Sequence, residues 1–325
     1  MNVLLRRQFL RMTAGAAVLP AAARFAQAQT YPARPVRIVV GFAPAGVQDI
    51  FARLISGWLS ERFGQTFVVE NRPGAGGNIA AELVVKAPAD GHTLLLVTSS
   101  AAINASLYEK LSFNFVRDIA PVAGISRAPL TMLVHPSLPA YTVPEFIAFA
   151  KSNPGRVNFA SPGAGSVPHI AGELFKTMAG LDIQHVPYRG GGPALTDLVA
   201  GQVQMMFSNS PILDHIRAGR LRALAVTTTT PSNVIPDLPT VNASLPGFEA
   251  SNWQGIGAPR HTPVDIIETL NRAIQTALGV AKLKQQLADI DGIVMPGSPG
   301  DFGRLIADET EKWGRVIRTA KIQPI

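Results

Sequence analysis

The sequence predicts an α/β protein with two lobes, each built on a mostly parallel sheet flanked by helices. Short apolar runs alternate with helical patterns, as in proteins whose parallel strands are connected by helices. The alternation occurs twice, in residues 36–100 and in residues 157–209. Two irregular stretches with prolines, residues 117–136 and 245–263, separate the blocks, and we interpret them as paired crossovers that form a hinge. With 325 residues and 47% hydrophobic side chains, the chain is long enough for a core in both lobes.

The first block opens with β-branched residues that predict a buried strand at Ile38–Val40. Small and rigid residues at Phe42–Gly46 follow as a tight loop, and a helix with apolar residues at regular spacing begins at Gln48. The other elements expected here are strands at Thr66–Glu70 and Thr93–Val97 and a helix at Ile79–Ala87.

The second block repeats the order of strand, glycine-rich loop and helix. Two amphipathic helices follow near the C-terminus, at residues 266–287 and 302–317. We expect lobe 1 to contain residues 29–131 and 249–325 and lobe 2 to contain residues 132–248. Within lobe 2 the expected strands are Val157–Ala160, Ile183–Val186 and Val203–Phe207, and the expected helices are His169–Met178 and Ala194–Ala200.

Residues 1–28 have the features of an export signal rather than of a folded segment. Arg6-Arg-Gln-Phe-Leu10 matches a twin-arginine pattern, an apolar run follows, and small residues permit cleavage after Ala28. An ordinary secretory signal with two chance arginines remains an alternative, and both interpretations imply export. No later stretch has the roughly 18 consecutive apolar residues of a membrane-spanning helix.

The basic net charge of the chain is partly a property of this signal. The formal charge of +7 falls to +3 when residues 1–28, which carry four arginines and no acid, are removed. The remainder has no run of Lys or Arg and no basic residues interleaved with aromatic ones, so it lacks the pattern of a nucleic-acid-binding surface. The small residual charge is compatible with an anionic ligand.

Sequence motifs for catalysis and metal binding are missing. The chain has no cysteine, which excludes disulfides, thiolate metal sites and a cysteine nucleophile. The six histidines lack the helical spacing of a metal site, and no serine lies in a Gly-x-Ser-x-Gly motif. We therefore expect neither a metal nor a cofactor and interpret the protein as a carrier of small molecules. An exported, cofactor-dependent α/β enzyme built from distant residues remains an alternative.

Two glycine loops follow predicted strands, Gly74-Ala-Gly-Gly77 and Gly163-Ala-Gly-Ser166. Neither completes Gly-x-Gly-x-x-Gly, because Ile79 and Pro168 occupy the final position, so a dinucleotide site is not favoured. Tight turns that need positive φ and loops that approach a ligand both remain open.

Loops that follow predicted strands are expected at the same edges of their sheets. Ligands of open α/β sheets bind beyond the carboxyl ends of the strands, so two lobes whose loops face each other would enclose a ligand. The helix that begins at Gln48 adds free backbone N–H groups and a positive dipole end, which suit a carboxylate. The loops concerned are residues 42–49, 98–100, 161–166, 188–192 and 208–209.

Individual polar residues have more than one interpretation. Asp49 either complements the dipole at a helix N-terminus or contributes to the pocket, and His169 either contacts a ligand or is a structural histidine. Tyr188 is a candidate pocket wall beside three glycines. Trp253 fits either a pocket or the packing of the hinge, whereas the Met205-Met206 pair is expected in the core.

Six segments match a known family in order along the chain: Tyr31–Val40, Val69–Asn78, Ala89–Leu96, Ala102–Tyr108, Val186–Asp197 and Ile235–Thr240. Together they resemble the Bug-type periplasmic solute-binding proteins, which are receptors of tripartite tricarboxylate transporters. The resemblance implies a type II periplasmic-binding-protein-like fold whose two lobes close about a hinge. It implies a periplasmic receptor that captures a small organic carboxylate and delivers it to membrane permease subunits. A ligand-sensing subunit for a periplasmic sensor is an alternative with the same pocket.

The resemblance also implies which residues contact the carboxylate. In the family, the loop after the first strand holds a ligand carboxylate largely through backbone groups and ordered water. From lobe 1 the implied residues are Phe42, Ala43, Pro44, Ala45, Gly46, Gln48, Asp49, Ser99 and Ser100. From lobe 2 they are Ser161, Gly163, Gly165, Ser166, His169, Tyr188, Gly190 and Gly191, with Ser208 at the end of the last strand of the block.

Three places depart from the family pattern. Ala43, Ala45, Val47 and Gln48 belong to a loop that is usually richer in Pro and Gly. Ser208 stands where Asp is frequent, which removes the partner of a ligand ammonium group, and Ala101 stands where His is common. We therefore expect a monomeric receptor for a mono- or dicarboxylate with an apolar or aromatic body, rather than for an amino acid.

Overall fold

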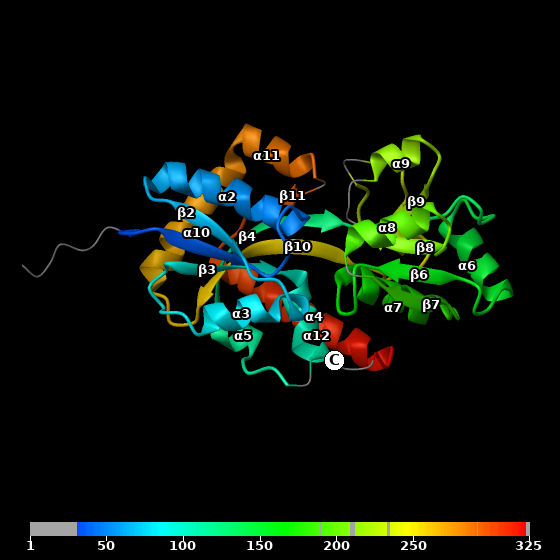
Figure 1. The fold of residues 1–325 in the computed structure, drawn as a ribbon, viewed down its shortest axis with the longest axis horizontal. Coiled ribbons are helices and arrows are strands. Elements are labelled where there is room, and N and C mark those ends of the chain that lie inside the picture. The colour runs from blue at the N-terminus through cyan, green and yellow to red at the C-terminus, as the bar shows by residue number, and fades with distance from the viewer. Residues whose placement is uncertain are drawn as a thin grey trace, which may run out of the picture. The chain divides into compact units, whose positions relative to one another are not determined.

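The chain divides into two units, Met1–Ala33 and Arg34–Ile325, in the computed structural model (Figure 1). The structure describes residues 31–108, 110–188, 190–208, 212–232, 235–290 and 292–322. The expected export signal, with its cleavage point after Ala28, lies outside the described residues. In the first unit the Tyr31–Pro32 peptide bond is cis.

The second unit contains two sheets, and each sheet with its helices forms one lobe. The sheet of lobe 1 has six strands in the order β11-β4-β10-β3-β1-β2. β1 pairs in parallel with β2 and β3, whereas β10 is antiparallel to β3 and β4, and β11 is antiparallel to β4. The bounds are β1 Val36–Val40, β2 Phe67–Asn71, β3 Thr93–Thr98, β4 Ile119–Pro129, β10 Ser251–Pro259 and β11 Ile293–Val294.

Helices cover both faces of this sheet (Figure 1). On one face lie α2 (Val47–Phe63), α10 (Val264–Gly279) and α11 (Ala281–Ala288). On the other lie α3 (Asn78–Val85), α4 (Ser99–Leu107), α5 (Phe115–Asp118) and α12 (Pro299–Thr319), with the short helix η2 (Ala75–Gly77) before α3. Local signals set several ends: Ser298 and Asp301 form a capping box at the start of α12, and Gly64, with φ of 65°, ends α2.

The sheet of lobe 2 has five strands in the order β7-β6-β8-β5-β9. Successive strand residues point to opposite faces. Phe159 and Phe207 therefore pack with Phe175 of α7, while Ala160 and Met206 pack with Leu198 of α8. The strands are β5 Thr131–Val134, β6 Asn158–Ser161, β7 Gln184–Pro187, β8 Met205–Ser208 and β9 Arg222–Val226. The helices are α6 Val143–Ser152, α7 Val167–Ala179, α8 Gly191–Val199, α9 Leu213–Arg217 and the short η3 Val241–Ala243.

Both sheets are mixed, which corrects the expectation of mostly parallel sheets. In lobe 2, β6 is parallel to β7 and β8, but β5 is antiparallel to β8 and β9. Every antiparallel pair includes a strand from the stretches that we expected to be irregular crossovers. Residues 117–136 contain β4 and β5, and residues 245–263 contain β10. Register shifts between β4 and β10, beside Gly255 and Gly257, break the alternation that identifies a strand in a sequence.

Thr227 joins the two crossovers where they leave lobe 1. Leu130 N donates to Thr227 Oγ1 at 2.8 Å, and Thr227 N donates back to Leu130 O at 2.9 Å. Ala250 N donates to Thr227 O at 3.1 Å, and Thr227 Oγ1 donates to Ala250 O. Since Thr227 is fully buried, these bonds are shielded from water and hold three chain segments together.

Candidate functional site

In lobe 1, two neighbouring strands are each followed by a helix that begins near the carboxyl end of the strand. β1 leads through residues 41–46 into α2, and β3 leads into α4. The N-cap residues are Gly46 and Thr98, and neither helix has a side-chain hydrogen bond at its N-cap. The first backbone N–H groups of both helices are therefore not satisfied by a capping side chain, which is the arrangement of an anion site.

Asp49 shapes the loop before α2. Its Oδ2 accepts hydrogen bonds from Ala45 N at 2.9 Å and Arg53 Nε at 2.8 Å, and its Oδ1 accepts one from Asn71 Nδ2 at 3.0 Å. Burial raises the pKa of Asp49, but the hydrogen bonds from Arg53, Ala45 and Asn71 outweigh it and leave the pKa below its usual value. Asp49 is 3% exposed, and both of its carboxylate oxygens accept hydrogen bonds. It therefore closes the loop, a role that neither of the two interpretations from the sequence included.

The other residues of this loop present mainly backbone. Asn71 Nδ2 also donates to Phe42 O at 3.0 Å, so β2 holds both ends of the loop. Ala45 has a left-handed φ of 63°, and the side chains of Ala43, Pro44 and Ala45 are exposed. Gly46 and Gln48 are partly exposed at the start of α2. The structure therefore places the predicted loop residues where their backbone groups are accessible.

The glycine loop before α3 lies against the loop after β1. A Cβ on Gly41 would be 2.6 Å from Gly77 Cα, so the two backbones touch and a side chain would not fit. Gly74, Gly76 and Gly77 have φ of 130°, 63° and 96°. The glycines of this loop therefore permit both its tight turn and its close approach to the backbone of the loop after β1.

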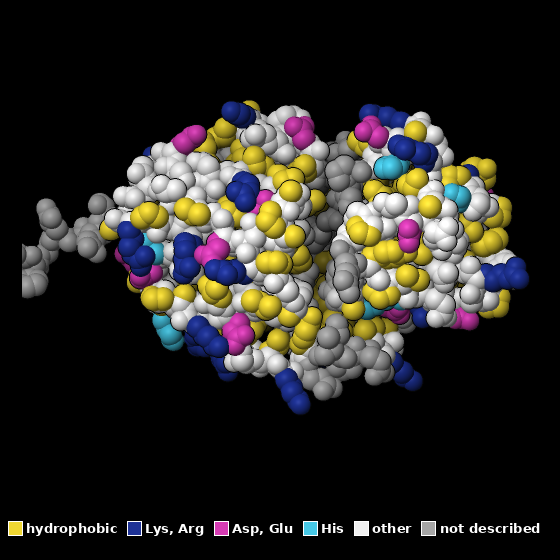
Figure 2. Space-filling view, viewed as in Figure 1, with side chains coloured by type: hydrophobic (Ala, Val, Ile, Leu, Met, Phe, Trp, Pro, Cys, Tyr) yellow, Lys and Arg dark blue, Asp and Glu magenta, His cyan; other side chains and the backbone are white. Residues whose placement is uncertain are grey.

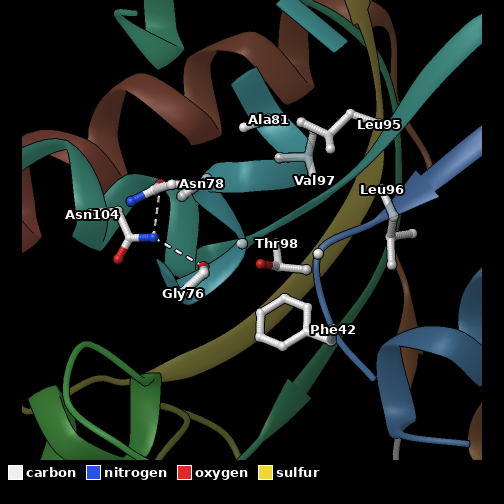
Figure 3. Close-up of a pocket in the computed structure, with 12 residues that line it drawn as sticks. Phe42, Gly76, Asn78, Ala81, Leu95, Leu96, Val97, Thr98 and Asn104 are labelled. Atoms are coloured by element: carbon white, nitrogen blue, oxygen red, sulfur yellow. Dashed lines mark hydrogen bonds between the residues drawn. The ribbon is translucent and has the colours of Figure 1, made fainter. Parts of the chain in front are cut away.

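A small cavity lies between these loops (Figure 3). Its volume of about 20 Å³ is enough for roughly one water molecule. In its wall, Asn104 Nδ2 donates to Gly76 O at 3.0 Å and to Asn78 Oδ1 at 3.1 Å (Figure 3). Asn78 Nδ2 and Asn104 Oδ1 are buried without a hydrogen-bond partner within the described residues, which is typical of groups that bind ordered water.

Asn71, Asn78 and Asn104 were missed by sequence reasoning. Each lies in a segment that carries the family resemblance, Val69–Asn78 or Ala102–Tyr108. Their place in these segments was the only feature of the sequence that could have identified them. None was singled out, because their partners lie on other elements.

The predicted serines of α4 have different environments. Ser99 is fully buried, and its Oγ donates to Asn252 Oδ1 at 2.7 Å, which fixes the start of α4 on β10. Ser100 is 8% exposed in the first turn of α4. The hydroxyl of Ser99 is thus engaged within the protein, and only its backbone belongs to the open helix end.

Lobe 2 has a strand-end loop whose side chains bond to each other. Ser166 is the N-cap of α7: its Oγ accepts from His169 N at 3.4 Å and donates to Gly163 O at 2.7 Å. Ser161 Oγ is 2.7 Å from His185 Nε2 and accepts from Gly163 N at 3.2 Å. Gly163 and Gly165 have φ of 144° and 76°. The structure brings these predicted residues together, but their hydroxyls are engaged.

His169 stacks on His185, with 3.9 Å between ring centroids and 22° between ring planes. Phe159 also stacks on His185, with 4.9 Å between ring centroids. Burial lowers the pKa of His169 to about 4, and burial together with the charges of His169 and Lys176 lowers that of His185 to about 3. Both rings are therefore neutral at pH 7. Gly165 N donates to His169 Nδ1 at 3.2 Å, which leaves the ring proton on Nε2.

His185 was missed by sequence reasoning. It lies on β7, parallel to β6, and pairs in register with Phe159. A histidine in a short strand has no distinctive spacing, so no sequence signal identified it.

The loop before α8 packs on the loop before α7. Tyr188 N donates to Ser161 O and Gly190 N donates to Pro162 O, both at 2.9 Å. Tyr188 OH donates to Asp197 at 2.7 Å, and burial, then Asp197, raises the pKa of Tyr188 to about 12. α8 begins at Gly191 after Gly190, with no capping side chain, so its first turn is open like those of α2 and α4.

Contacts between the lobes occur at α4. A Cβ on Gly165 would be 2.6 Å from Leu107 Cδ2 and 3.5 Å from Asn104 Oδ1, so the loop before α7 lies directly on α4. α7 also contacts α4 and α12. Ser208, the remaining predicted residue, ends β8 opposite Thr131 and is 1% exposed.

Trp253 and the Met205-Met206 pair, which the sequence singled out, are both buried. Trp253 is fully buried, donates from Nε1 to Glu309 and contacts Phe302 edge-on, so it packs the crossover β10 against α12. The Met205-Met206 pair is buried, as expected for core.

The wider structure adds three observations. Within the described ranges, no cluster of three or more His, Asp or Glu side chains is arranged to hold a metal ion. No helix in the same ranges is long and apolar enough to cross a membrane. On the face in Figure 2, Lys and Arg side chains are interspersed with Asp and Glu.

Known proteins share both the sequence and the fold. The model of a family described as tripartite tricarboxylate transporter family receptor matches residues 51–322. Protein BugT of Bordetella pertussis is 39% identical over 295 residues, which cover 90% of each chain. The structure of R. palustris Rpa4515 with adipate has a TM-score of 0.83 and 38% identity and covers 91% of this chain and 100% of that one. MatC from Rhodopseudomonas palustris with bound malate has a TM-score of 0.79 and 33% identity and covers 88% and 100%.

Proposed function

Because this chain belongs to the tripartite tricarboxylate transporter receptor family, we propose that it captures a small organic carboxylate between its lobes and delivers it to a membrane permease. The observation that carries the proposal is the pair of open helix N-termini, α2 and α4, at the carboxyl ends of neighbouring parallel strands. Two sets of backbone N–H groups with two positive dipole ends suit a carboxylate, which needs several donors. Two structural relatives are described with adipate and with malate, both dicarboxylates.

The carboxylate binds mainly to lobe 1. Asp49 and Asn71 hold the loop before α2 in a shape that leaves its backbone accessible. Lobe 2 contributes neutral aromatic surface, because the rings of His169 and Tyr188 carry no charge at pH 7. The open first turn of α8 supplies a second, weaker anion position, so a dicarboxylate is favoured.

The site residues of this proposal are those implied by the sequence, with roles adjusted by their contacts. Phe42, Ala43, Pro44, Ala45, Gly46, Gln48 and the backbone of Ser99 and Ser100 bind or surround the carboxylate. Gly163, Gly165, His169, Tyr188, Gly190, Gly191 and Ser208 surround the ligand body. Asp49, Ser161 and Ser166 position the loops through the hydrogen bonds described above.

The cellular setting is part of the proposal. Residues 1–28 direct export and are removed near Ala28, and the mature protein works in the periplasm as a monomer without a cofactor. Lobe 1 comprises residues 29–131 and 249–325, lobe 2 comprises residues 132–248, and the crossovers joined by Thr227 act as the hinge. The bound molecule leaves unchanged, so the protein is a receptor and not an enzyme.

Calorimetry tests the proposal directly. The exported protein is titrated with adipate, malate, benzoate and aspartate, and each mixture is analysed for chemical change of the ligand. We expect one of the three carboxylates that lack an ammonium group to bind with micromolar or better affinity and to be recovered unchanged. Absence of binding by all three, or recovery of a product, contradicts the proposal. Native mass spectrometry of the protein as purified identifies any ligand that it carries from the cell.

A further inference from the structure

A second cavity lies in lobe 1, between the edge of the sheet at β4 and β11 and the start of α12. Its volume of about 270 Å³ is more than ten times that of the cavity beside Asn104 and approaches the size of small-molecule sites. None of the residues in its wall belongs to the strand-end loops of the proposed carboxylate site.

Arg127 of β4 provides a cation with unused hydrogen-bonding capacity in the wall of this cavity. Its Nε is buried and has no hydrogen-bond partner among the described residues. The residue as a whole is partly exposed and lines the cavity, so other atoms of its side chain are accessible. A guanidinium group suits the two oxygens of a carboxylate.

The two neighbouring acids each have another cation as ion-pair partner. Asp301 lies in the wall, but it accepts from Ser298 N at 2.8 Å and from Ser298 Oγ at 2.6 Å, and it is paired with Arg304. Glu249 interacts electrostatically with Arg127, but its ion pair is with Lys312. The charge of Arg127 is thus only partly compensated by the protein.

The rest of the wall is largely apolar. Ile293, Met295, Phe302 and Leu305 line the cavity together with Arg127. Burial of apolar ligand surface against these side chains favours binding. One cation in an apolar wall selects a ligand with one carboxylate and a short hydrocarbon chain, because a second charge would be desolvated without a partner.

The wall of the cavity includes residues of one crossover, β4, and two wall residues adjoin the other crossover, β10. Arg127 pairs in register with Trp253 of β10 and lies two residues before Pro129, where β4 ends. Phe302 contacts Trp253 edge-on, with 5.8 Å between ring centroids. We infer that this cavity is a second ligand site, specific for small monocarboxylates with an apolar chain, separate from the site between the lobes.

Hexanoate is the probe, with hexanol and hexylammonium as neutral and cationic controls. The protein is purified after export with ¹³C-methyl methionine, and the methyl resonance of Met295 is assigned with Met295→Leu. We expect hexanoate to shift the Met295 resonance with saturation, and hexanol and hexylammonium to bind at least tenfold more weakly.

Two substitutions test the wall itself. Arg127→Gln removes the charge, and Leu305→Trp fills the cavity without changing charge; each is expected to weaken hexanoate binding at least tenfold. Arg272→Gln, which removes an exposed charge on α10, is the matched control and should leave it unchanged. Melting curves show which variants are folded. Because the two substitutions act by different mechanisms, weaker hexanoate binding in both folded variants is not explained by a shared folding defect.

A substitution in the other site separates the two sites. Gly46→Val alters the loop before α2 and should leave the Met295 shift intact. Three results overturn the inference: no shift of Met295 in the unchanged protein, equal binding by folded Arg127→Gln, or loss of the shift in Gly46→Val. The last result would place hexanoate between the lobes instead.

Discussion

The strand-end loops of the two lobes are built on opposite principles. In lobe 1 the helices α2 and α4 begin after Gly46 and Thr98 without a capping side chain, so backbone donors remain available. In lobe 2 the helix α7 begins after Ser166, whose hydroxyl caps it, and Ser161, His169 and His185 bond or stack among themselves. Lobe 1 therefore offers unsatisfied backbone donors at two helix starts, whereas lobe 2 offers a preassembled neutral surface at α7 and one open helix start, at α8.

This difference assigns different tasks to the lobes. A negative ligand group gains most where donors have no other partner, so the proposed receptor function assigns charge recognition to lobe 1. The stacked rings of lobe 2 are held by packing and suit the uncharged body of a ligand. Changes in lobe 1 should therefore reduce affinity first, and changes in lobe 2 should reduce stability first.

The largest expected effect is the pH dependence of lobe 2. The folded-state pKa values of about 4 for His169 and about 3 for His185 lie below the unfolded value of 6.5. The unfolded chain therefore binds more protons below pH 6.5, and the free energy of unfolding falls as pH decreases from about 6.5 toward 4. The slope approaches at most about 1.4 kcal/mol per pH unit for each histidine.

Urea unfolding at a series of pH values measures this slope. His169→Gln should reduce it, and His261→Gln, at an exposed position, should not. Equal slopes for the unchanged protein and His169→Gln would show that the stack is not a neutral pair.

The next effect concerns the open end of α2. Gly46→Val should weaken carboxylate binding about 10- to 100-fold, as expected for the loss of roughly 1.4–3 kcal/mol from blocked backbone donors. The fold should tolerate the change, since φ of Gly46 is −79° and a Cβ there meets Ala43 O only at 3.4 Å. Calorimetry with the ligand identified above measures the affinity. Unchanged affinity would remove Gly46 from the site.

Asp49→Ala separates loop anchoring from a helix-dipole effect. Asp49 accepts three hydrogen bonds, so its loss should destabilise the protein by about 1–3 kcal/mol and also weaken binding. Asp265→Ala, in the first turn of α10 and exposed, should cost only several tenths of a kcal/mol. Thermal unfolding measures the stability of both variants, and calorimetry measures their affinity. Equal stability losses in the two variants would show that Asp49 acts only on the helix dipole.

The smallest effect is expected from the cap of α7. Ser166→Ala should destabilise the protein by about 1 kcal/mol through loss of the N-cap bond, with at most a slight change in affinity. Thr142→Ala, which removes the corresponding cap of α6, is the matched control. A large affinity loss in Ser166→Ala alone would give lobe 2 a direct polar role and contradict the division of tasks.

The elements that carry the site followed closely from the chain. Strands at Val36–Val40 and Thr93–Thr98 appear in the sequence as short β-branched or apolar runs, and α2 as a helical period after a glycine. Helix starts were less accurate. α7 begins at Val167 and α8 at Gly191, two and three residues earlier than expected, because Pro168 and the glycines of α8 were assigned to loops.

Pairing between distant segments could not be read in the same way. Asn71 anchors the loop at Phe42 and Asp49 only because β2 lies beside β1, and His185 stacks on His169 only because β7 lies beside β6. The strands β4 and β10 were taken for irregular crossovers, because register shifts interrupt their alternation. The mixed sheet of lobe 1 follows from those two strands, and that of lobe 2 follows from β5, which lies in the same stretch as β4.

Local sequence thus specified where strands end, where helices begin without a cap, and which family the chain resembles, because these depend on neighbouring residues or on matched segments. Whether a polar group is left for a ligand depends on long-range pairing. The hydroxyls of Ser99 and Ser161 looked available in the sequence, and Asn252 and His185 engage them in the folded protein. Arg127 is the converse, since only the packing of α12 and β11 on β4 places it in the wall of a cavity.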